Sequence, residues 1–356
     1  MSLGATILNL AVRLLDASGT QIPRGAGSDP RILVIRRNRM GDMICTLPLL
    51  QALRRRFPGA HLAVACDEAG LPIAQACSAV DEVILLSHGW NRWLSLLASA
   101  RRLRSFDCVI AAKGGFDRRL AVLTRLTGAA RRIGYARTPE QGAPYFTDIV
   151  PIPDNMWEIH QSDTMLRLLQ PLELAPPADP PPDPVLTLPE SAKKFCDQLL
   201  AQPPFSEAPG YFAVNISSTV KPRFRDDAFV ALLGRLIEAS PAAVVIVFAP
   251  KDLARAEAIV AAVGSARVVA VETPSPLDLA ALLERTTLLI TPEGGAAHLA
   301  TVMGAPALVL WYEGPFEKWR SLGPKHMFVR LRSGEKSLPL DRVWDALAPL
   351  LTTPSR

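Results

Sequence analysis

The densest group of residues able to do chemistry combines a carboxylate, two glycines and a histidine: Glu293, Gly294, Gly295 and His298. An apolar run at 287–290 precedes them, and the small and apolar residues that follow predict a helix. A strand that opens through glycines into a helix directs backbone N–H groups and the positive end of the helix dipole toward an anion such as a phosphate. The segment therefore predicts a site for a nucleotide-linked sugar. Helix capping by Glu293 with core packing of His298 is the alternative.

A second carboxylate, Asp42, also follows a predicted strand. The apolar segment 31–37 predicts a buried strand, Gly41 turns the chain, and a helix is predicted to start after Asp42. A carboxylate at the carboxyl end of a parallel strand lies where such sheets bind ligands, and there it can take a proton from an attacking hydroxyl. The alternative is that Asp42 only caps the helix.

Polar residues follow two more predicted strands in the second half of the chain. Hydroxyl and basic side chains, which suit a diphosphate, follow the strand predicted at 212–216: Ser217, Ser218, Lys221 and Arg223. Asp252 follows the strand predicted at 244–248, where a carboxylate can accept hydrogen bonds from ribose hydroxyls. A solvated polar loop and a helix cap are the respective alternatives.

These residues need a frame of strands and helices to hold them. Short apolar strands alternate with helical patterns over most of the chain, which predicts a doubly wound α/β fold with parallel sheets. Further strands are predicted at 61–66, 82–86, 108–112, 268–271, 288–291 and 308–311, and helices at 47–57, 90–103 and 341–351.

A proline-rich segment predicts a linker between two domains, because proline cannot continue a helix or a central strand. The length of 356 residues suffices for two domains of ordinary size. We expect an N-terminal domain at 1–175, which begins with an amphipathic lead segment at 1–30, and the linker at 171–184. A C-terminal domain at 185–340 and a last helix with its tail at 341–356 are expected to follow. Two such domains predict a ligand-binding cleft between the carboxyl ends of their sheets.

The composition is that of a soluble globular protein, with 49% hydrophobic and 21% charged residues. The net charge of +5 arises in residues 1–180, which hold 21 Lys and Arg against 16 Asp and Glu. This bias suits an anionic acceptor or an anionic membrane surface. No apolar stretch is long enough for a transmembrane helix, the start lacks a signal-peptide layout, and no nucleic-acid-binding module is recognisable. Five scattered cysteines predict reduced, buried thiols in a cytoplasmic protein, with neither disulfides nor a metal site.

Taken in order, the motifs resemble those of ADP-heptose:lipopolysaccharide heptosyltransferases, which form glycosyltransferase family 9. The resemblance runs from Ile32 to about Leu351. It rests on two ordered motifs: Met40-Gly41-Asp42 with Thr46-Leu-Pro48, and Glu293-Gly-Gly295-Ala-Ala-His298 with Gly304-Ala-Pro306. The ordered set is more specific for the family than for one acceptor.

The resemblance implies a GT-B fold, in which two doubly wound Rossmann-like domains face a central cleft. It implies an inverting transfer of a heptose from ADP-heptose to the lipopolysaccharide inner core, with no metal and no cofactor. The acceptor would bind the first domain and the nucleotide sugar the second. Asp42 matches the catalytic base of the family. The expected donor-binding residues are Ser217, Ser218, Lys221, Arg223, Asp252, Glu293, Gly294, Gly295 and His298, and the candidates for the acceptor's anionic groups are Arg37, Arg39 and Arg118.

Two departures from the family pattern leave alternatives open. Glu293 and Gly294 stand where the family has Asp followed by Thr or Ser, so a UDP- or GDP-sugar is an alternative donor. Pro222 stands where the family has a lysine, so Lys221 or Arg223 is expected to provide the cation. A non-catalytic homologue that binds nucleotide sugars is the other alternative. The enzyme is expected in the cytoplasm with peripheral contact to the inner membrane, and the helix near 5–16 lies either on that membrane or on the first domain.

Overall fold

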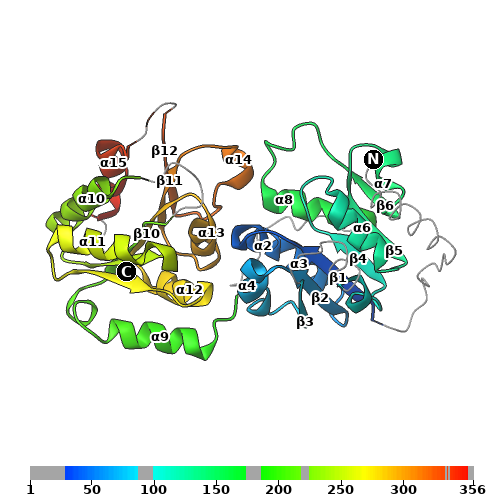
Figure 1. Cartoon of the computed structure of the whole chain (residues 1–356), viewed down its shortest axis with the longest axis horizontal. Helices are drawn as coiled ribbons and strands as arrows, with labels where there is room; N and C mark the ends of the chain where they lie inside the picture. The colour runs from blue at the N-terminus through cyan, green and yellow to red at the C-terminus, as the bar shows by residue number, and fades with distance from the viewer. Residues whose placement is uncertain are drawn as a thin grey trace. The chain divides into compact units, whose positions relative to one another are not determined.

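The computed structural model describes residues 29–86, 99–173, 186–217, 224–332, 335 and 337–351. The chain forms two compact units, Met1–Val185 and Leu186–Arg356, and each contains one six-stranded sheet (Figure 1). Residues 1–28 of the expected lead segment, 174–184 of the expected linker and most of the helix expected at 90–103 lie outside the described residues.

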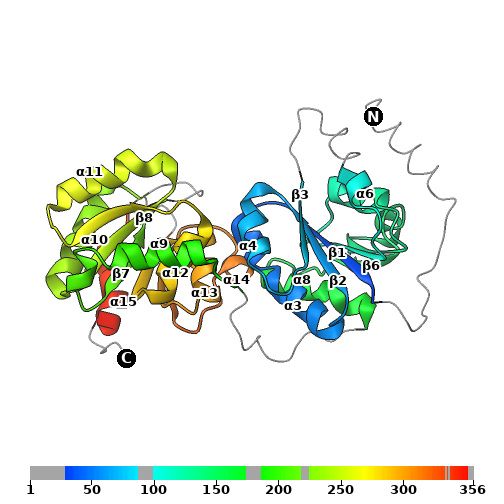
Figure 2. The same cartoon turned by 90° about the horizontal axis from the view of Figure 1, so that it is seen from below.

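The first unit has the strand order β3-β2-β1-β4-β5-β6, and its strand pairings are parallel. Figure 2 shows α6 on one face of this sheet and α3 with α8 on the other. The elements are β1 (Arg31–Arg36), α2 (Met40–Ile44), α3 (Leu47–Arg56), β2 (His61–Cys66), α4 (Leu71–Gln75), β3 (Glu82–Leu85), β4 (Cys108–Ala111), α6 (Arg118–Leu126), β5 (Arg131–Ala136), α7 (Pro139–Gly142), β6 (Asp148–Pro151) and α8 (Gln161–Leu166).

The second unit has the strand order β12-β11-β10-β7-β8-β9, again with parallel pairings. Numbered from its own first strand, this order is the same as that of the first unit. The elements are α9 (Glu190–Leu200), β7 (Tyr211–Asn215), α10 (Asp226–Ala239), β8 (Ala243–Phe248), the 3-10 helix η4 (Pro250–Asp252), α11 (Leu253–Val263), β9 (Val268–Glu272), α12 (Pro276–Arg285), β10 (Leu288–Pro292), α13 (Gly295–Val302), β11 (Ala307–Trp311), α14 (Phe316–Trp319), β12 (His326–Arg330) and α15 (Leu340–Leu351).

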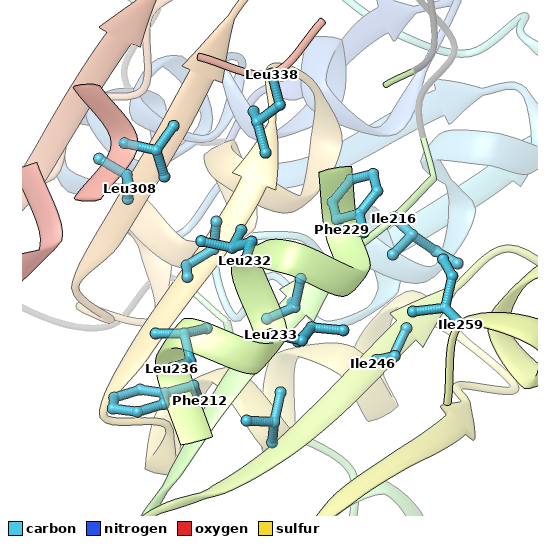
Figure 3. Packing of buried hydrophobic residues seen from close by; sticks show 14 of the residues in the cluster. Phe212, Ile216, Phe229, Leu232, Leu233, Leu236, Ile246, Ile259, Leu308 and Leu338 are labelled. Atoms are coloured by element: carbon cyan, nitrogen blue, oxygen red, sulfur yellow. The ribbon is translucent and has the colours of Figure 1, made fainter. Parts of the chain in front are cut away.

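The apolar side chains on each face of the central strands pack against helices and form the core of each unit. In the second unit, Phe212 and Ile246 face the apolar side of α10, where Leu232, Leu233 and Leu236 are fully buried (Figure 3). The spacing of these leucines places them on one face of the helix. Because both faces of a parallel sheet are covered by helices, its strands are apolar throughout and hold their carboxyl ends rigidly.

Each sheet has one point where the strand order reverses direction. In the first unit this switch point lies between β1 and β4, and in the second it lies between β7 and β10. Open α/β sheets bind ligands outside the carboxyl ends of the strands at this point. The fold therefore identifies two edges where functional side chains are expected.

The predicted doubly wound α/β fold is confirmed, but three strands were not predicted. The strands β5, β6 and β12 were missed, because β5 begins with two arginines, β6 is four residues long and includes Asp148 and Pro151, and β12 is a half-buried edge strand. The other predicted strands agree with the structure to within one residue at either end. Among the described residues, no helix is both long enough and apolar enough to cross a bilayer.

Candidate active site

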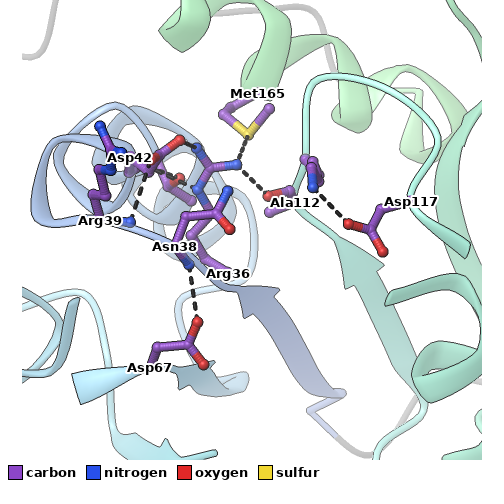
Figure 4. A network of polar contacts seen from close by, with 10 residues as sticks. Arg36, Asn38, Arg39, Asp42, Asp67, Ala112, Asp117 and Met165 are labelled. Atoms are coloured by element: carbon purple, nitrogen blue, oxygen red, sulfur yellow. Dashed lines mark hydrogen bonds and ion pairs between the residues drawn. The ribbon is translucent and has the colours of Figure 1, made fainter. Parts of the chain in front are cut away.

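Asp42 lies at the carboxyl end of β1, beside the switch point of the first unit. The prediction that the helix starts after Asp42 was wrong, because α2 already begins at Met40. The Arg39 backbone N–H donates to Asp42 Oδ2 over 3.3 Å, so the carboxylate does cap this helix. Its other oxygen pairs with the buried guanidinium of Arg36 (Figure 4). The side chain keeps 15% exposure, which leaves it accessible to a substrate.

The loop between β1 and α2 is held in an uncommon backbone conformation. Asn38 has a φ of 110°, a backbone conformation that residues other than glycine rarely adopt. Asp67, directly after β2, fixes this loop by accepting from the Asn38 N–H at 3.1 Å and from Arg37 Nε at 3.2 Å. Strained loops that are held in this way are common at functional sites.

The three arginines predicted to bind the acceptor follow β1 and β4, on the two sides of the switch point. Arg37 forms an ion pair with Asp67, whereas Arg39 is exposed. Arg118 opens α6, is exposed, and its guanidinium makes no hydrogen bond or ion pair with the described residues. Lys113 is paired with Asp117 over 2.5 Å in the same β4–α6 loop. The edge is therefore basic, but Arg37 is already engaged.

A cavity of about 340 Å³ lies beside this edge, where β4, β5 and β6 end. Its lining is Gly114, Gly115, Phe116, Arg137, Gln141, Ile152, Pro153, Asp154, Met156 and Trp157. Trp157 is 64% exposed, which is unusual for a large aromatic side chain. Sequence reasoning missed these residues because β5 and β6 were not predicted. The glycine pair after the strand predicted at 108–112 was a signal that could have found the cavity.

In the second unit, side chains connect the two strands of the switch point. Asn215, the last residue of β7, donates from Nδ2 to Thr291 Oγ1 over 3.0 Å. The Asn215 Oδ1 accepts from the backbone N–H of Ser217 at 3.0 Å. Asn215 therefore joins β7 to β10 and sets the start of the polar loop. Asn215 falls inside the strand predicted at 212–216, and the sequence alone did not indicate this role.

Ser217 and Asp252, both predicted to bind the donor, are brought together and bond to each other. The Ser217 hydroxyl donates to Asp252 Oδ2 over 2.6 Å and accepts from the Ala249 N–H at 2.8 Å. Asp252 ends η4 and is 2% exposed. The predicted residues Ser218, Lys221 and Arg223 lie outside the described residues.

Arg255 of α11 bonds to both sides of this segment and was not predicted as a site residue. Its guanidinium donates to the carbonyl oxygens of Ile216 at 2.8 Å and Phe224 at 2.6 Å. It also pairs with Asp226, at the start of α10, over 2.6 Å. These contacts fix the two ends between which the predicted diphosphate-binding residues are found.

The predicted strand, glycine turn and helix around Glu293 are confirmed. Glu293 follows β10, and Gly294 with a φ of 141° is the N-cap of α13, so no side chain caps this helix. His298 is buried in the second turn of α13. The N–H groups at the start of α13 are therefore not capped by a side chain, and the predicted anion site there stays a prediction.

The Glu293 carboxylate is buried without being satisfied. The residue is 8% exposed, and neither side-chain oxygen has a hydrogen-bond partner among the described residues. Burial raises the pKa of Glu293 to about 7, against the nearby backbone N–H groups of Glu313 and Tyr312, which favour the ionised form. Unsatisfied buried acceptors are rare, so this carboxyl group is suited to a ligand that brings hydroxyl or amine donors.

A known protein family matches most of the chain. The model of glycosyltransferase family 9 (heptosyltransferase) matches residues 96–341. A comparison with the sequences of curated proteins finds no match.

Solved structures with a similar fold span nearly the whole chain. The glycosyl transferase family 9 protein of Veillonella parvula DSM 2008 has a TM-score of 0.78 at 19% identity, over 90% of this chain and 97% of its own. The E. coli heptosyltransferase WaaC with ADP has a TM-score of 0.71 at 20% identity, over 90% and 99%. The E. coli ADP-heptose lps heptosyltransferase II has a TM-score of 0.68 at 20% identity, over 90% and 98%. The expected GT-B fold of two Rossmann-like domains is confirmed at this level. Because the family model matches more than half of its residues, the chain belongs to glycosyltransferase family 9, and it is a glycosyltransferase.

Proposed function

We propose that this enzyme transfers a heptose from ADP-heptose to the inner core of lipopolysaccharide. The observation that carries the proposal is the buried, unsatisfied carboxyl group of Glu293 at the start of α13, in a member of this family. A buried carboxyl group that has no hydrogen-bond partner among the described residues, next to a helix start without a side-chain cap, suits a ligand with both hydroxyls and phosphates. A nucleotide sugar has both.

In the proposed reaction, Asp42 is the general base. The acceptor hydroxyl oxygen bonds to the anomeric carbon of the donor sugar, and its proton passes to the Asp42 carboxylate. The bond from the anomeric carbon to the diphosphate oxygen breaks, and its electron pair leaves with the nucleoside diphosphate. Attack from the face opposite the leaving group inverts the anomeric centre.

On the donor side, we assign charge stabilisation of the diphosphate to the start of α13 with Lys221 and Arg223. His298 would donate a hydrogen bond to the sugar or a phosphate. Ser217 already bonds to Asp252, so we assign this pair to the shape of the ribose pocket rather than to direct charge stabilisation. These groups would neutralise the leaving diphosphate without a metal ion.

On the acceptor side, we assign the anionic groups of the core to Arg39 and Arg118, with Arg37 as a weaker candidate because Asp67 engages it. The neighbouring cavity supports this assignment, because Trp157 offers an aromatic face to a sugar ring and the Arg137 guanidinium, also in its lining, makes no hydrogen bond or ion pair with the described residues. A lipopolysaccharide acceptor implies peripheral contact with the cytoplasmic face of the inner membrane.

A calorimetric comparison of ADP, UDP and GDP tests the donor. We expect ADP to bind most tightly, and Lys221→Ala or Arg223→Ala to weaken it by about 10-fold, the usual loss for one charge-assisted hydrogen bond. Lys251→Ala, an exposed lysine of η4, is the matched control and should leave the affinity unchanged.

A clear preference for UDP or GDP would keep the fold and the reaction type and replace the donor, as the Glu293-Gly294 pair allows. No binding of any nucleotide would contradict the proposal.

A further inference from the structure

Arg36, the last residue of β1, has the largest fully buried side chain near the switch point, at 2% exposure. Its Nε donates to the Asp42 backbone oxygen over 3.1 Å, and Nη2 pairs with Asp42 Oδ1. Its Nη1 donates to the Ala112 carbonyl over 2.6 Å and contacts Met165 Sδ at 3.7 Å (Figure 4). One guanidinium thus connects the ends of β1 and β4 with α2 and α8.

These contacts make the two oxygens of Asp42 unequal. Oδ1 faces the buried guanidinium, whereas from the described residues Oδ2 receives only the longer bond of 3.3 Å from the Arg39 N–H. An attacking hydroxyl can therefore deliver its proton only to Oδ2 without breaking the ion pair. The network selects one oxygen and one orientation of the carboxylate.

A lysine could not reproduce these contacts. The guanidinium is planar and donates in three fixed directions, toward Asp42 Oδ1, the Asp42 carbonyl and the Ala112 carbonyl. A lysine ammonium is a single point on a flexible chain. Burial lowers the pKa of Arg36 from its usual value, but the Asp42 carboxylate opposes this effect and an arginine remains charged.

We infer that Arg36 is a positioning residue of the transfer reaction, which fixes the Asp42 carboxylate so that Oδ2 accepts the proton. The inference rests on the proposed role of Asp42 as the base. Arg36 itself, buried behind Asp42, does not touch the substrate.

The test compares transfer from ADP-heptose to a lipopolysaccharide core that lacks heptose, using the full chain and its Arg36→Lys variant. We expect kcat to fall on the order of 100-fold with little change in the donor KM, because a base that is misplaced by about 1 Å loses this much rate. Arg36→Met, which removes every donor to the Asp42 carboxylate from this position, should lower kcat at least as much, again with little change in the donor KM. The affinity for ADP should stay within about 2-fold in both variants.

Arg54→Lys is the matched control. Arg54 is also an arginine that donates to carbonyl oxygens, those of Ala79 and Ala60, and to a carboxylate, that of Asp81. These partners lie before β2 and β3, at the opposite end of the sheet from Asp42. The variant should lose stability while its kcat and its donor KM remain those of the unaltered chain.

Asp42→Asn separates the two ideas. If Asp42→Asn keeps only a low residual rate and adding Arg36→Lys lowers that rate no further, the two residues act as one unit, as inferred. If Asp42→Asn loses its activity while Arg36→Lys keeps full kcat, the inference is wrong and the proposed role of Asp42 as the base is kept. A fully active Asp42→Asn overturns both.

Should Arg36→Lys fail to fold, NMR of the unaltered chain decides. The Arg36 side-chain N–H signals should exchange slowly and shift in Asp42→Asn. Exchange as fast as that of the exposed Arg118 would overturn the inference.

Discussion

The buried carboxyl group of Glu293 lacks a hydrogen-bond partner among the described residues, and this affects its protonation. A carboxyl group that is buried without hydrogen bonds favours its neutral form, and its pKa of about 7 expresses this preference. A ligand with hydroxyl or amine donors can provide the hydrogen bonds that the ionised carboxylate lacks and so offset the cost of its burial. The ligand-free protein should therefore be less stable at pH values at which this carboxyl group must ionise.

This property predicts how stability depends on pH. Because the folded pKa of Glu293 is raised from 4.5, its contribution is fully present below pH 4.5 and is lost as pH rises through about 7. Relative to Glu293→Gln, which does not titrate, the unaltered chain should lose up to about 3 kcal/mol of unfolding free energy over this interval. Urea unfolding at several pH values measures the difference, and parallel curves for the two proteins would contradict it.

At the residue scale the sequence indicated which groups matter but not what holds them. The positions of Asp42, Glu293 and His298 followed from strand ends and glycines. The pairing of Asp42 with Arg36, and the lack of partners around Glu293, depend on contacts with residues distant in the chain. Local pattern contains no information about such contacts, so the alternatives of capping and catalysis stayed open.

Among the elements, α13 depends on a single glycine at its start. Gly294 has a φ of 141° and a ψ of −158°, a combination that is essentially restricted to glycine, although a Cβ there would meet no atom within 4 Å. Gly294→Ala should therefore destabilise the unit by about 1–3 kcal/mol through backbone strain alone.

Gly234→Ala is the matched control for this prediction. A Cβ at Gly234 also meets open space, but Gly234 lies inside α10 with a helical backbone. Alanine there should stabilise the protein by about 0.5–1 kcal/mol. Urea unfolding of both variants is the measurement, and equal effects of the same sign would show that φ at Gly294 does not constrain this turn.

Elements could be predicted from the sequence where an apolar run was continuous. The strands β1, β2, β7, β8, β10 and β11 are buried on both faces and were found. The strands β5, β6 and β12 carry arginines, a proline or exposed positions, because they lie toward the edges of their sheets. These segments form strands because they pair with a neighbouring strand, and their own composition does not predict this pairing.

At the scale of the whole molecule, the described residues proposed to bind the donor all belong to the second unit, Leu186–Arg356, which has a core of its own. A fragment of these residues should therefore fold and bind the same nucleotide within about 10-fold of the full chain, because domains with separate cores are commonly independent. Calorimetry of the fragment tests this expectation. A fragment that does not unfold cooperatively, or that binds no nucleotide, would show that the first unit is required.

The shared strand order of the two units affects how each candidate site is assembled. At each switch point, the residues that bond across the strand ends are 76 positions apart in the chain, Arg36 with Ala112 and Asn215 with Thr291. Closing a long loop costs more chain entropy than closing a short one, so this joint is the least favoured contact of each sheet during folding. Neither site can exist until its distant strand has been synthesised and docked. A substrate bound to both strands of a switch point would therefore stabilise the contact between the two halves of that sheet, which the longest chain connection joins.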